Sequence, residues 1–389
     1  MKKKIVILGS TGSIGTTLLD IINHNKKEYE IKLLTANKNY KTLLKQAKKF
    51  NVKNLIITNK KSYILLKKVN KNKNIRIFNN FECFNKIFNQ KVDYTMSSII
   101  GIDGLLPTLK IIEFTKNIAI ANKESIICGW RFINAALKKN KTGFIPLDSE
   151  HFSVWSLLKD EKKNNIKKIY ITASGGPFLK KKFENIKNIK PKFALNHPNW
   201  QMGAKISIDS ATMMNKIFEI IEAIKIFNFD ANKFEILIHP KSYVHAIVHY
   251  NNGLTKLLAH DTTMEIPIAN AIYFGKNNYF HNKSFNFKKL NDLNFLKPNI
   301  QKFPLLKILN YKFKNTYFEV ILVSINDGLV NMYLDGKIQY ISIHKNMLKL
   351  LKDPFFVKYY LKKPKNINDI KLMVEKVNQY LYKYLDLNN

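Results

Sequence analysis

The chain has 389 residues, of which 46% are hydrophobic, and its formal net charge is +37. This length and composition suit a globular protein of two or three domains, each with its own core. No uncharged apolar run approaches the roughly 20 residues of a membrane-spanning helix, and the apolar stretch after the first lysines is too short for a secretion signal. The two cysteines, Cys83 and Cys128, argue against a disulfide framework or a cysteine-rich zinc site and suit a reducing compartment.

The positive charge is carried almost entirely by lysine. Of 65 basic residues only Arg76 and Arg131 are arginines, and the lysines are spread along the whole chain among many asparagines and isoleucines. Surfaces that recognise phosphates or bases usually use the bidentate arginine fork. We therefore interpret the charge as the result of mutational bias in AT-rich coding DNA, which favours lysine, asparagine and isoleucine codons. We expect no nucleic-acid or membrane partner. A basic nucleic-acid-binding protein is an alternative that explains the charge alone.

The N-terminal region predicts a dinucleotide-binding turn. An apolar strand at residues 4–8 leads into Gly9-Ser10-Thr11-Gly12-Ser13-Ile14-Gly15, and a helix is expected from about Thr16. Glycines between a strand and a helix let the backbone approach a pyrophosphate, which then lies at the positive end of the helix. The spacing G-x-x-G-x-x-G differs from the commoner G-x-G-x-x-G, so a tight turn without a ligand is the alternative.

The next predicted strand, at residues 31–35, leads to Asn37-Lys38-Asn39. A site for NAD usually places an acidic side chain about 20 residues beyond the glycines, and the lysine found here favours the 2′-phosphate of NADP instead. The alternation then continues and predicts a doubly wound parallel sheet. Its further strands are expected at residues 54–57, 75–78, 94–101 and 118–120, with a helix at 105–114.

Two carboxylates lie one residue apart in Pro146-Leu147-Asp148-Ser149-Glu150-His151, after an expected strand at residues 143–147. In an extended segment Asp148 and Glu150 point to the same face, while Ser149 points elsewhere. Carboxylate oxygens are the ligands that hard divalent cations prefer. The pair therefore predicts half of a metal site, with an acidic surface turn as the alternative.

A second polar group is expected on a helix that begins at Ser210. As the N-cap, Ser210 would add its hydroxyl to the first free amides and form an anion site. Asn215 lies four residues and Lys216 three residues before Glu219, so that the three side chains share one helical face. Glu219 is thus the candidate third ligand of the cation, with Asn215 and Lys216 directed at a substrate phosphate.

Three further segments predict ligand contacts. Ser174 opens a glycine turn that suits phosphate binding, and Lys123 follows a strand of the parallel sheet, where a cation can meet a substrate oxygen. The segment His197-Pro198-Asn199-Trp200-Gln201-Met202-Gly203 has no regular period and predicts a lid that closes over a ligand, with a packed surface loop as the alternative.

The remaining chain predicts a second sheet and a helical end. Strands are expected at residues 235–239, 246–250 and 254–258, and together they are expected to form an antiparallel part of a second sheet. Residues 275–303 have no clear period and predict a linker. From about Pro304 a helical period runs to the end of the chain and predicts a small bundle.

Taken in order, these motifs closely resemble the 1-deoxy-D-xylulose 5-phosphate reductoisomerase family. The resemblance covers nearly the whole chain and is most specific between residues 94 and 268. It is carried by residues 9–15, Ala121-Asn122-Lys123-Glu124-Ser125, residues 146–151, Ser174-Gly175-Gly176-Pro177-Phe178, His197-Pro198-Asn199-Trp200 and residues 205–216.

The resemblance implies a bacterial cytoplasmic homodimer that is an NADP-dependent oxidoreductase. Such enzymes rearrange a sugar phosphate, 1-deoxy-D-xylulose 5-phosphate, and reduce it to 2-C-methyl-D-erythritol 4-phosphate in the non-mevalonate isoprenoid pathway. The implied domains are an NADPH-binding domain at 1–147, a catalytic and dimerisation domain at 148–274 with a flexible loop at about 174–204, the linker at 275–303, and a helical domain at 304–389.

The resemblance also assigns roles to residues of this chain. Asp148, Glu150 and Glu219 would bind Mg²⁺ or Mn²⁺, and Lys123 would act with them in catalysis. Substrate contacts would come from Ser149, Ser174, His197, Trp200, Ser210, Asn215 and Lys216. Cofactor contacts would come from Gly9, Ser10, Thr11, Gly12, Ser13, Ile14, Asn37, Lys38, Asn39, Asn122, Glu124, Gly203 and Met264. Met202 would belong to the closing loop, and His151 and His245 would line the pocket.

Three positions and one short segment depart from the family pattern. Asn37 and Ile217 stand where glycine is usual, Glu265 stands where arginine is usual, and residues 324–327 replace an Ala-Ala-Asn-Glu motif. None of these removes an implied ligand, so we expect an active enzyme. A decayed, inactive relative and a metal-assisted NADP dehydrogenase of a hydroxy acid are the alternatives; the second does not explain two phosphate-binding serine turns.

Overall fold

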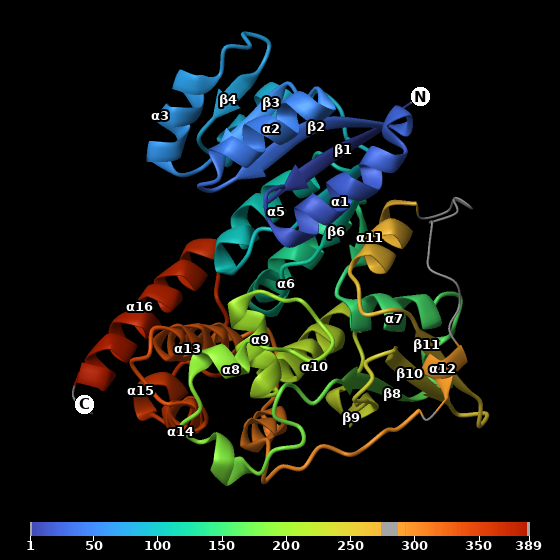
Figure 1. The fold of residues 1–389 in the computed structure, drawn as a ribbon, viewed down its shortest axis with the longest axis vertical. Coiled ribbons are helices and arrows are strands. Elements are labelled where there is room, and N and C mark those ends of the chain that lie inside the picture. Colours follow the sequence, from blue (N-terminus) through green and yellow to red (C-terminus); the bar gives the residue numbers. More distant parts are fainter. Residues whose placement is uncertain (1, 274–286, 292, 387–389) are drawn as a thin grey trace. The chain divides into compact units, whose positions relative to one another are not determined.

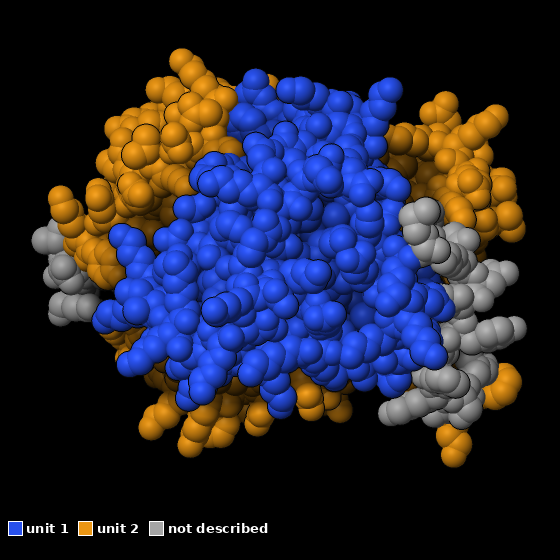
Figure 2. Space-filling model, turned by 90° about the horizontal axis from the view of Figure 1, so that it is seen from above, with its two compact units in different colours: residues 1–126, 130–148, 264–282 blue, residues 127–129, 149–263, 283–389 orange. Residues whose placement is uncertain are grey.

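The computed structural model describes residues 2–273, 287–291 and 293–386, and these form two compact units. Unit 1 takes in residues 2–126, 130–148 and 264–273 of the described chain, and unit 2 takes in the rest (Figure 2). Part of the predicted linker, residues 275–286 and 292, lies outside the described residues. Within the described part of the chain, no helix is long and apolar enough to cross a membrane.

Unit 1 is built on a parallel sheet of seven strands in the order β4-β3-β2-β1-β5-β6-β7. Strands β1 to β4 and β6 of this sheet are labelled in Figure 1. Every neighbouring pair in this order is parallel. The chain thus winds outward from β1 in both directions, and the predicted doubly wound sheet is confirmed. The strands are β1 (Lys3–Leu8), β2 (Tyr29–Ala36), β3 (Asn54–Ile57), β4 (Arg76–Phe78), β5 (Tyr94–Ser97), β6 (Asn117–Ile120) and β7 (Gly143–Pro146).

Short polar side chains fix where several helices of unit 1 begin. Asn39, Asn59 and Asn122 each accept a hydrogen bond from a backbone amide of the first turn that follows them. The helices are α1 (Ser13–His24), α2 (Tyr40–Phe50), α3 (Lys60–Val69), α4 (Phe84–Ile87), α5 (Leu105–Ile112), α6 (Lys123–Lys139) and α11 (Glu265–Ile272), with 3-10 turns at Lys26–Glu28, Phe81–Cys83 and Ile102–Gly104.

Helix α11 belongs to unit 1 although it follows the second sheet in the sequence. It packs beside α1, and the ammonium of Lys3 donates to the Ile272 carbonyl at 2.5 Å. The amide of Asn25 donates to the Tyr273 hydroxyl at 3.0 Å. The chain therefore returns to the first unit after residue 263.

Unit 2 contains a mixed sheet in the order β11-β10-β8-β9. Strand β10 is antiparallel to β11, as predicted, and to β8. The antiparallel prediction is wrong for β9, which pairs with β8 in parallel. The strands are β8 (Ile166–Ala173), β9 (Phe234–Ile238), β10 (Val244–Tyr250) and β11 (Thr255–Ala259). The helices before and among them are α7 (Ser149–Leu157), α8 (Pro191–Ala194), α9 (Ala204–Ala211) and α10 (Met214–Phe227), with 3-10 turns at Lys163–Asn165, Phe183–Ile186 and Ala231–Lys233.

The C-terminal part of unit 2 is helical, as predicted. Its central helix, α13, packs against α16, α14 and α9. Ahead of it lie α12 (Phe287–Leu290), within the described part of the predicted linker, and a 3-10 turn at Pro304–Asn310. The helices of this part are α13 (Tyr317–Leu334), α14 (Tyr340–Leu350), α15 (Pro354–Val357) and α16 (Ile367–Asp386).

Two local predictions are wrong. The segment Asp148–Glu150 is not extended, because the chain turns from β7 directly into α7 and Glu150 lies in the first helical turn. Ser210 is not an N-cap, since α9 already begins at Ala204 after Gly203. The next helix, α10, begins after Met213, which adopts a left-handed backbone conformation with φ of 63°.

A buried ion pair joins α10 to α13. The ammonium of Lys225 lies 3.0 Å from the Glu319 carboxylate, and the side chains are 2% and 0% exposed. Glu319 also accepts from the backbone amide of Thr316 and completes a capping box at the start of α13. The pair is therefore both a link between the helices and a part of the helix start.

Replacing one partner of this pair should destabilise the protein strongly. We expect Lys225→Met to lower the free energy of unfolding by about 3–5 kcal/mol, because it leaves the buried Glu319 carboxylate without its cation. The double variant Lys225→Met/Glu319→Gln should recover part of this loss, since glutamine is neutral and still caps the helix. Urea unfolding measures both.

The matched control is Lys256→Met, which breaks the exposed ion pair with Glu161. Its loss of stability should be far smaller, because exposed pairs are screened by water. Equal losses in Lys225→Met and the control would show that the buried pair contributes nothing special.

Candidate active site

Two carboxylates of unit 2, from separate places in its sequence, meet at one ammonium group. Glu150 lies in the first turn of α7 and Glu219 lies on α10, and both contact Lys216. Asp148 follows β7 and closes unit 1, so the chain itself keeps Asp148 two residues from Glu150. Of the three residues predicted as metal ligands, Glu150 and Glu219 are thus brought together within unit 2.

Ammonium groups lie against the carboxylates. Lys216 is 2.8 Å from Glu150 and 2.5 Å from Glu219. Lys123, at the start of α6, is 2.7 Å from Asp148. Burial by itself would lower the pKa of Lys216, but the adjacent carboxylates of Glu150 and Glu219 outweigh it and raise that pKa. Lys216 is therefore a cation at neutral pH.

The polar face predicted for α10 is present. The Asn215 amide donates to one Glu219 oxygen, and Lys216 donates to the other. The Ser149 hydroxyl donates to Glu150. The donor set fits a hard divalent cation, because it offers three carboxylates and no sulfur ligand.

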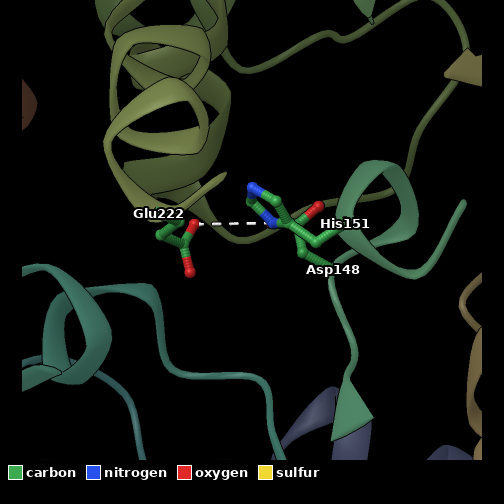
Figure 3. Close-up of side chains that lie close together, drawn as sticks. All are labelled: Asp148, His151 and Glu222. Carbon is green, nitrogen blue, oxygen red and sulfur yellow. Dashed lines mark ion pairs between the residues drawn. The ribbon is translucent and has the colours of Figure 1, made fainter. Parts of the chain in front are cut away.

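A further acidic residue, Glu222, which was not predicted from the sequence, lies one helical turn beyond Glu219. Glu222 faces the His151 ring, with 3.9 Å between Glu222 Oε2 and His151 Nδ1 (Figure 3). The other ring nitrogen of His151 donates to the Glu219 backbone carbonyl at 2.8 Å. Both side chains are buried. The signal in the sequence was the spacing of three residues between Glu219 and Glu222, which places them on one helical face.

The glycine turn after β8 lies against α9. Gly175 and Gly176 have φ of +83° and +70°. A Cβ on Gly176 would lie 2.8 Å from the Ser210 backbone oxygen, so only glycine fits this approach. The two serines predicted to bind phosphate, Ser174 and Ser210, therefore come from neighbouring backbone segments, although Ser210 lies near the end of its helix.

His197 is held by a directed set of hydrogen bonds. Its Nδ1 accepts from the backbone amides of Asn199 and Trp200 at 3.2 and 3.0 Å. This leaves the proton of the neutral ring on Nε2, which lies 2.8 Å from the Ser174 oxygen. Since the Gly176 amide also donates to that oxygen, the Ser174 hydroxyl hydrogen is directed to a further acceptor. Burial, with a smaller contribution from Lys216, lowers the pKa of His197 to about 4.

Aromatic rings lie beside the loop that carries His197. Trp200 contacts His245 edge to face, with ring centroids 6.0 Å apart. His245 in turn stacks on His260, with ring centroids 3.7 Å apart. His260 was not predicted from the sequence as a site residue. The Asn199 amide ties the loop to the segment before β10 through the Pro240 carbonyl and the Ser242 hydroxyl.

The N-terminal glycine turn is closely packed in unit 1. Gly9 has φ of +85°, and a Cβ there would lie 2.8 Å from the Ser98 carbonyl oxygen. Helix α1 starts at Ser13 after Gly12, without a side-chain cap. Its first amides are thus not covered by a side chain of the preceding residue.

The other predicted cofactor residues lie at strand and helix ends. Asn37 and Lys38 are exposed after β2, while the Asn39 side chain caps α2. Asn122 caps α6 and also donates to the carbonyls of Ile99 and Gly101. Thr11, Ile14 and Glu124 lie in or beside these two turns, Met264 directly precedes α11 in unit 1, and Gly203 precedes α9 in unit 2.

Family models for three parts of one enzyme match the chain in succession. The 1-deoxy-D-xylulose 5-phosphate reductoisomerase model matches residues 5–129, and two models described as C-terminal domains of the same enzyme match residues 144–227 and 260–380. The chain belongs to the 1-deoxy-D-xylulose 5-phosphate reductoisomerase family.

Relatives support this over the full length. The chain is 56% identical over 382 residues to the 1-deoxy-D-xylulose 5-phosphate reductoisomerase of Pelagibacter ubique, covering 97% of each chain. A crystal structure of a reductoisomerase with NADPH, fosmidomycin and magnesium matches with a TM-score of 0.92 at 31% identity, covering 99% of this chain and 98% of the other. The Zymomonas mobilis reductoisomerase with NADPH matches with a TM-score of 0.88 at 31% identity, covering 99% of both.

The protonation of His197 should be visible in the stability of the protein. A histidine whose pKa is lowered on folding favours the folded state fully above its unfolded pKa of about 6.5, and this contribution is lost as the pH falls through about 4. We therefore expect the melting temperature of the wild type to fall more steeply between pH 6.5 and 4 than that of His197→Gln. If the melting temperatures of the two proteins fell equally steeply over this pH range, the interpretation of His197 as a buried neutral ring would be contradicted.

Proposed function

We propose that this protein converts 1-deoxy-D-xylulose 5-phosphate to 2-C-methyl-D-erythritol 4-phosphate with NADPH and a divalent cation, Mg²⁺ or Mn²⁺. The reaction belongs to the non-mevalonate isoprenoid pathway. The observation that carries the proposal is the meeting of Glu150 and Glu219 at Lys216, with Asp148 two residues before Glu150, in a chain of this family. The reductoisomerase structures with NADPH and with magnesium support both cofactors.

Asp148, Glu150 and Glu219 hold the cation in this proposal. When bound, it polarises the substrate ketone and stabilises developing oxyanion charge, and NADPH supplies the hydride. Ser149 and Lys123 contact the oxygenated carbons of the substrate. Both are already held by hydrogen bonds to acidic neighbours, so little side-chain freedom is lost when the substrate binds.

The substrate phosphate is held by Ser174, Ser210, Asn215 and Lys216. The directed hydrogen bonds from His197 and Gly176 leave the Ser174 hydroxyl to donate to a phosphate oxygen. Lys216 supplies a cation from the same helical face as Asn215. His197 and Trp200 act from the loop at about 174–204, which we infer to close over the substrate and exclude water together with Met202, while His151 and His245 line the pocket.

NADPH lies on unit 1 in this proposal. Its pyrophosphate meets the turn at Gly9–Ile14 and the first amides of α1, and its 2′-phosphate meets the exposed Lys38 between Asn37 and Asn39. Asn122, Glu124, Gly203 and Met264 complete the contacts. The domain division of the family, with a cofactor domain at 1–147, a catalytic domain at 148–274, a linker at 275–303 and a helical domain at 304–389, is part of the same proposal.

The proposed metal site predicts a collapse of activity when one ligand is neutralised. Glu219→Gln keeps the size of the side chain but removes one of three ligand charges, so we expect kcat/KM to fall by at least about a hundredfold. The measurement is NADPH consumption with 1-deoxy-D-xylulose 5-phosphate and Mn²⁺, with and without a chelator. Glu235→Gln, on β9, is the matched control and should retain activity. Turnover that is indifferent to the chelator would refute the metal assignment.

We also infer a homodimer that acts in the bacterial cytoplasm, as the family resemblance implies. Strand β11 lies at an edge of the unit 2 sheet, and Leu254 and Leu257, beside and within it, are 60% and 44% exposed. Exposed apolar side chains on an edge strand favour pairing with another chain.

Sedimentation equilibrium at micromolar concentration should give twice the chain mass for the wild type. Leu257→Lys should shift the protein toward the monomer, because it places a charge on the exposed edge strand. A monomeric wild type would contradict the inference.

A further inference from the structure

The buried side-chain amide of Gln46 in unit 1 forms hydrogen bonds through both of its ends with one residue of the glycine turn, Ser10. Gln46 lies in the middle of α2, on the face that also buries Leu43 and Ala47. The residue is only 8% exposed. Its Nε2 donates to the Ser10 backbone carbonyl at 2.9 Å, and its Oε1 accepts from the Ser10 hydroxyl at 2.8 Å.

Ser10 is held from the other side by β2. Its backbone amide donates to the Thr35 carbonyl at 2.9 Å, and the Thr35 hydroxyl accepts from the Gly9 amide at the same distance. Ser10 is completely buried. The amide, hydroxyl and carbonyl of Ser10 are thus all bonded within the protein, which points its polar groups away from solvent.

The turn needs such support because its own backbone is permissive. Glycine adopts more backbone conformations than any other residue, and three of the seven residues from Gly9 to Gly15 are glycines. The two glycines at the ends are in close contact, since a Cβ on Gly15 would lie 2.5 Å from the Gly9 carbonyl oxygen. A small shift at Ser10 would therefore change the direction of the first amides of α1.

Helix α2 also connects the two halves of the proposed cofactor site. Its N-cap is Asn39, which directly follows Lys38, and Gln46 lies seven residues further along the helix, two turns away on the same side. Helix α2 thus begins directly after the segment proposed for the 2′-phosphate, and it carries Gln46, the side chain that holds the glycine turn proposed for the pyrophosphate.

We propose that Gln46 is a positioning residue for NADPH, which sets the course of the Gly9–Gly15 turn by holding Ser10 through both ends of its amide. In this role Ser10 shapes the turn and does not contact the cofactor with its side chain. The inference rests on the proposed binding of NADPH to unit 1 and adds to it a residue outside the contact set.

The test is the dissociation constant of NADPH, measured by fluorescence titration without substrate. Gln46→Leu removes both hydrogen bonds at similar volume and should weaken NADPH binding at least about tenfold, with kcat at saturating NADPH and KM for the sugar phosphate changed less than about twofold. Asn54→Leu is the matched control. That residue is also a buried amide of unit 1, which donates to the Lys32 carbonyl and accepts from Arg76, but it lies between outer strands away from the turn.

The control separates positioning from stability. Both leucine variants should lower the melting temperature, but only Gln46→Leu should change the affinity for NADPH. Binding within twofold of the wild type in folded Gln46→Leu, or equal weakening in the control, would overturn the proposal. If Gln46→Leu does not fold, Gln46→Glu decides by the same threshold, because it keeps the acceptor for the Ser10 hydroxyl and loses the donor to the Ser10 carbonyl.

A double-mutant cycle with Ser10→Ala adds a second test. The two changes should weaken binding together by less than the product of their separate effects, because they remove one shared interaction. Independent effects would overturn the proposal. Failure of the wild type to turn over the sugar phosphate while it binds NADPH would contradict the proposed function but not the role of Gln46.

Discussion

The structure of the active site depends on the mutual repulsion of carboxylates held within a few ångströms of each other. Glu150 and Glu219, which both contact the ammonium of Lys216, cannot lie so close together as free anions without a large electrostatic cost. The ammonium groups of Lys123 and Lys216 offset part of that cost, and a divalent cation would offset it more directly. The carboxylates therefore favour the binding of cations, and in the proposed function they hold two lysines beside the phosphorylated, oxygen-rich substrate.

Helix α10 is the element that makes this cluster possible. Its inward face carries Lys216, Glu219 and Glu222, and its far end is fixed by the ion pair of Lys225 with Glu319 on α13. Because this ion pair fixes the far end of the helix, its charged groups cannot easily move apart to relieve their repulsion. The helical C-terminal part of the chain thus contributes to the site through the position of α10 rather than by side chains of its own.

The departures from the family pattern fall where the fold tolerates them. Ile217 is fully buried on α10 and adds apolar packing to a helix that glycine would weaken. Asn37 is exposed after β2, outside the regular sheet. Glu265 lies in the first turn of α11, where a negative charge interacts favourably with the helix dipole. None of the three disturbs the carboxylate cluster.

The sequence by itself determined the parallel sheet, the glycine turn and the polar face of α10, because strand alternation, glycine spacing and helical spacing of three and four residues are local properties. It also contained the three carboxylates, together with a family resemblance that the comparisons confirm. It could not show that Asp148 and Glu150 come together through a strand-to-helix turn, or that a methionine, Met213, breaks the helix at a left-handed residue, because packing overrides local preference there. The partnership of Glu222 with His151, the stacking of His245 on His260 and the hold of Gln46 on Ser10 join residues far apart in the chain, and only the tertiary structure decides such contacts.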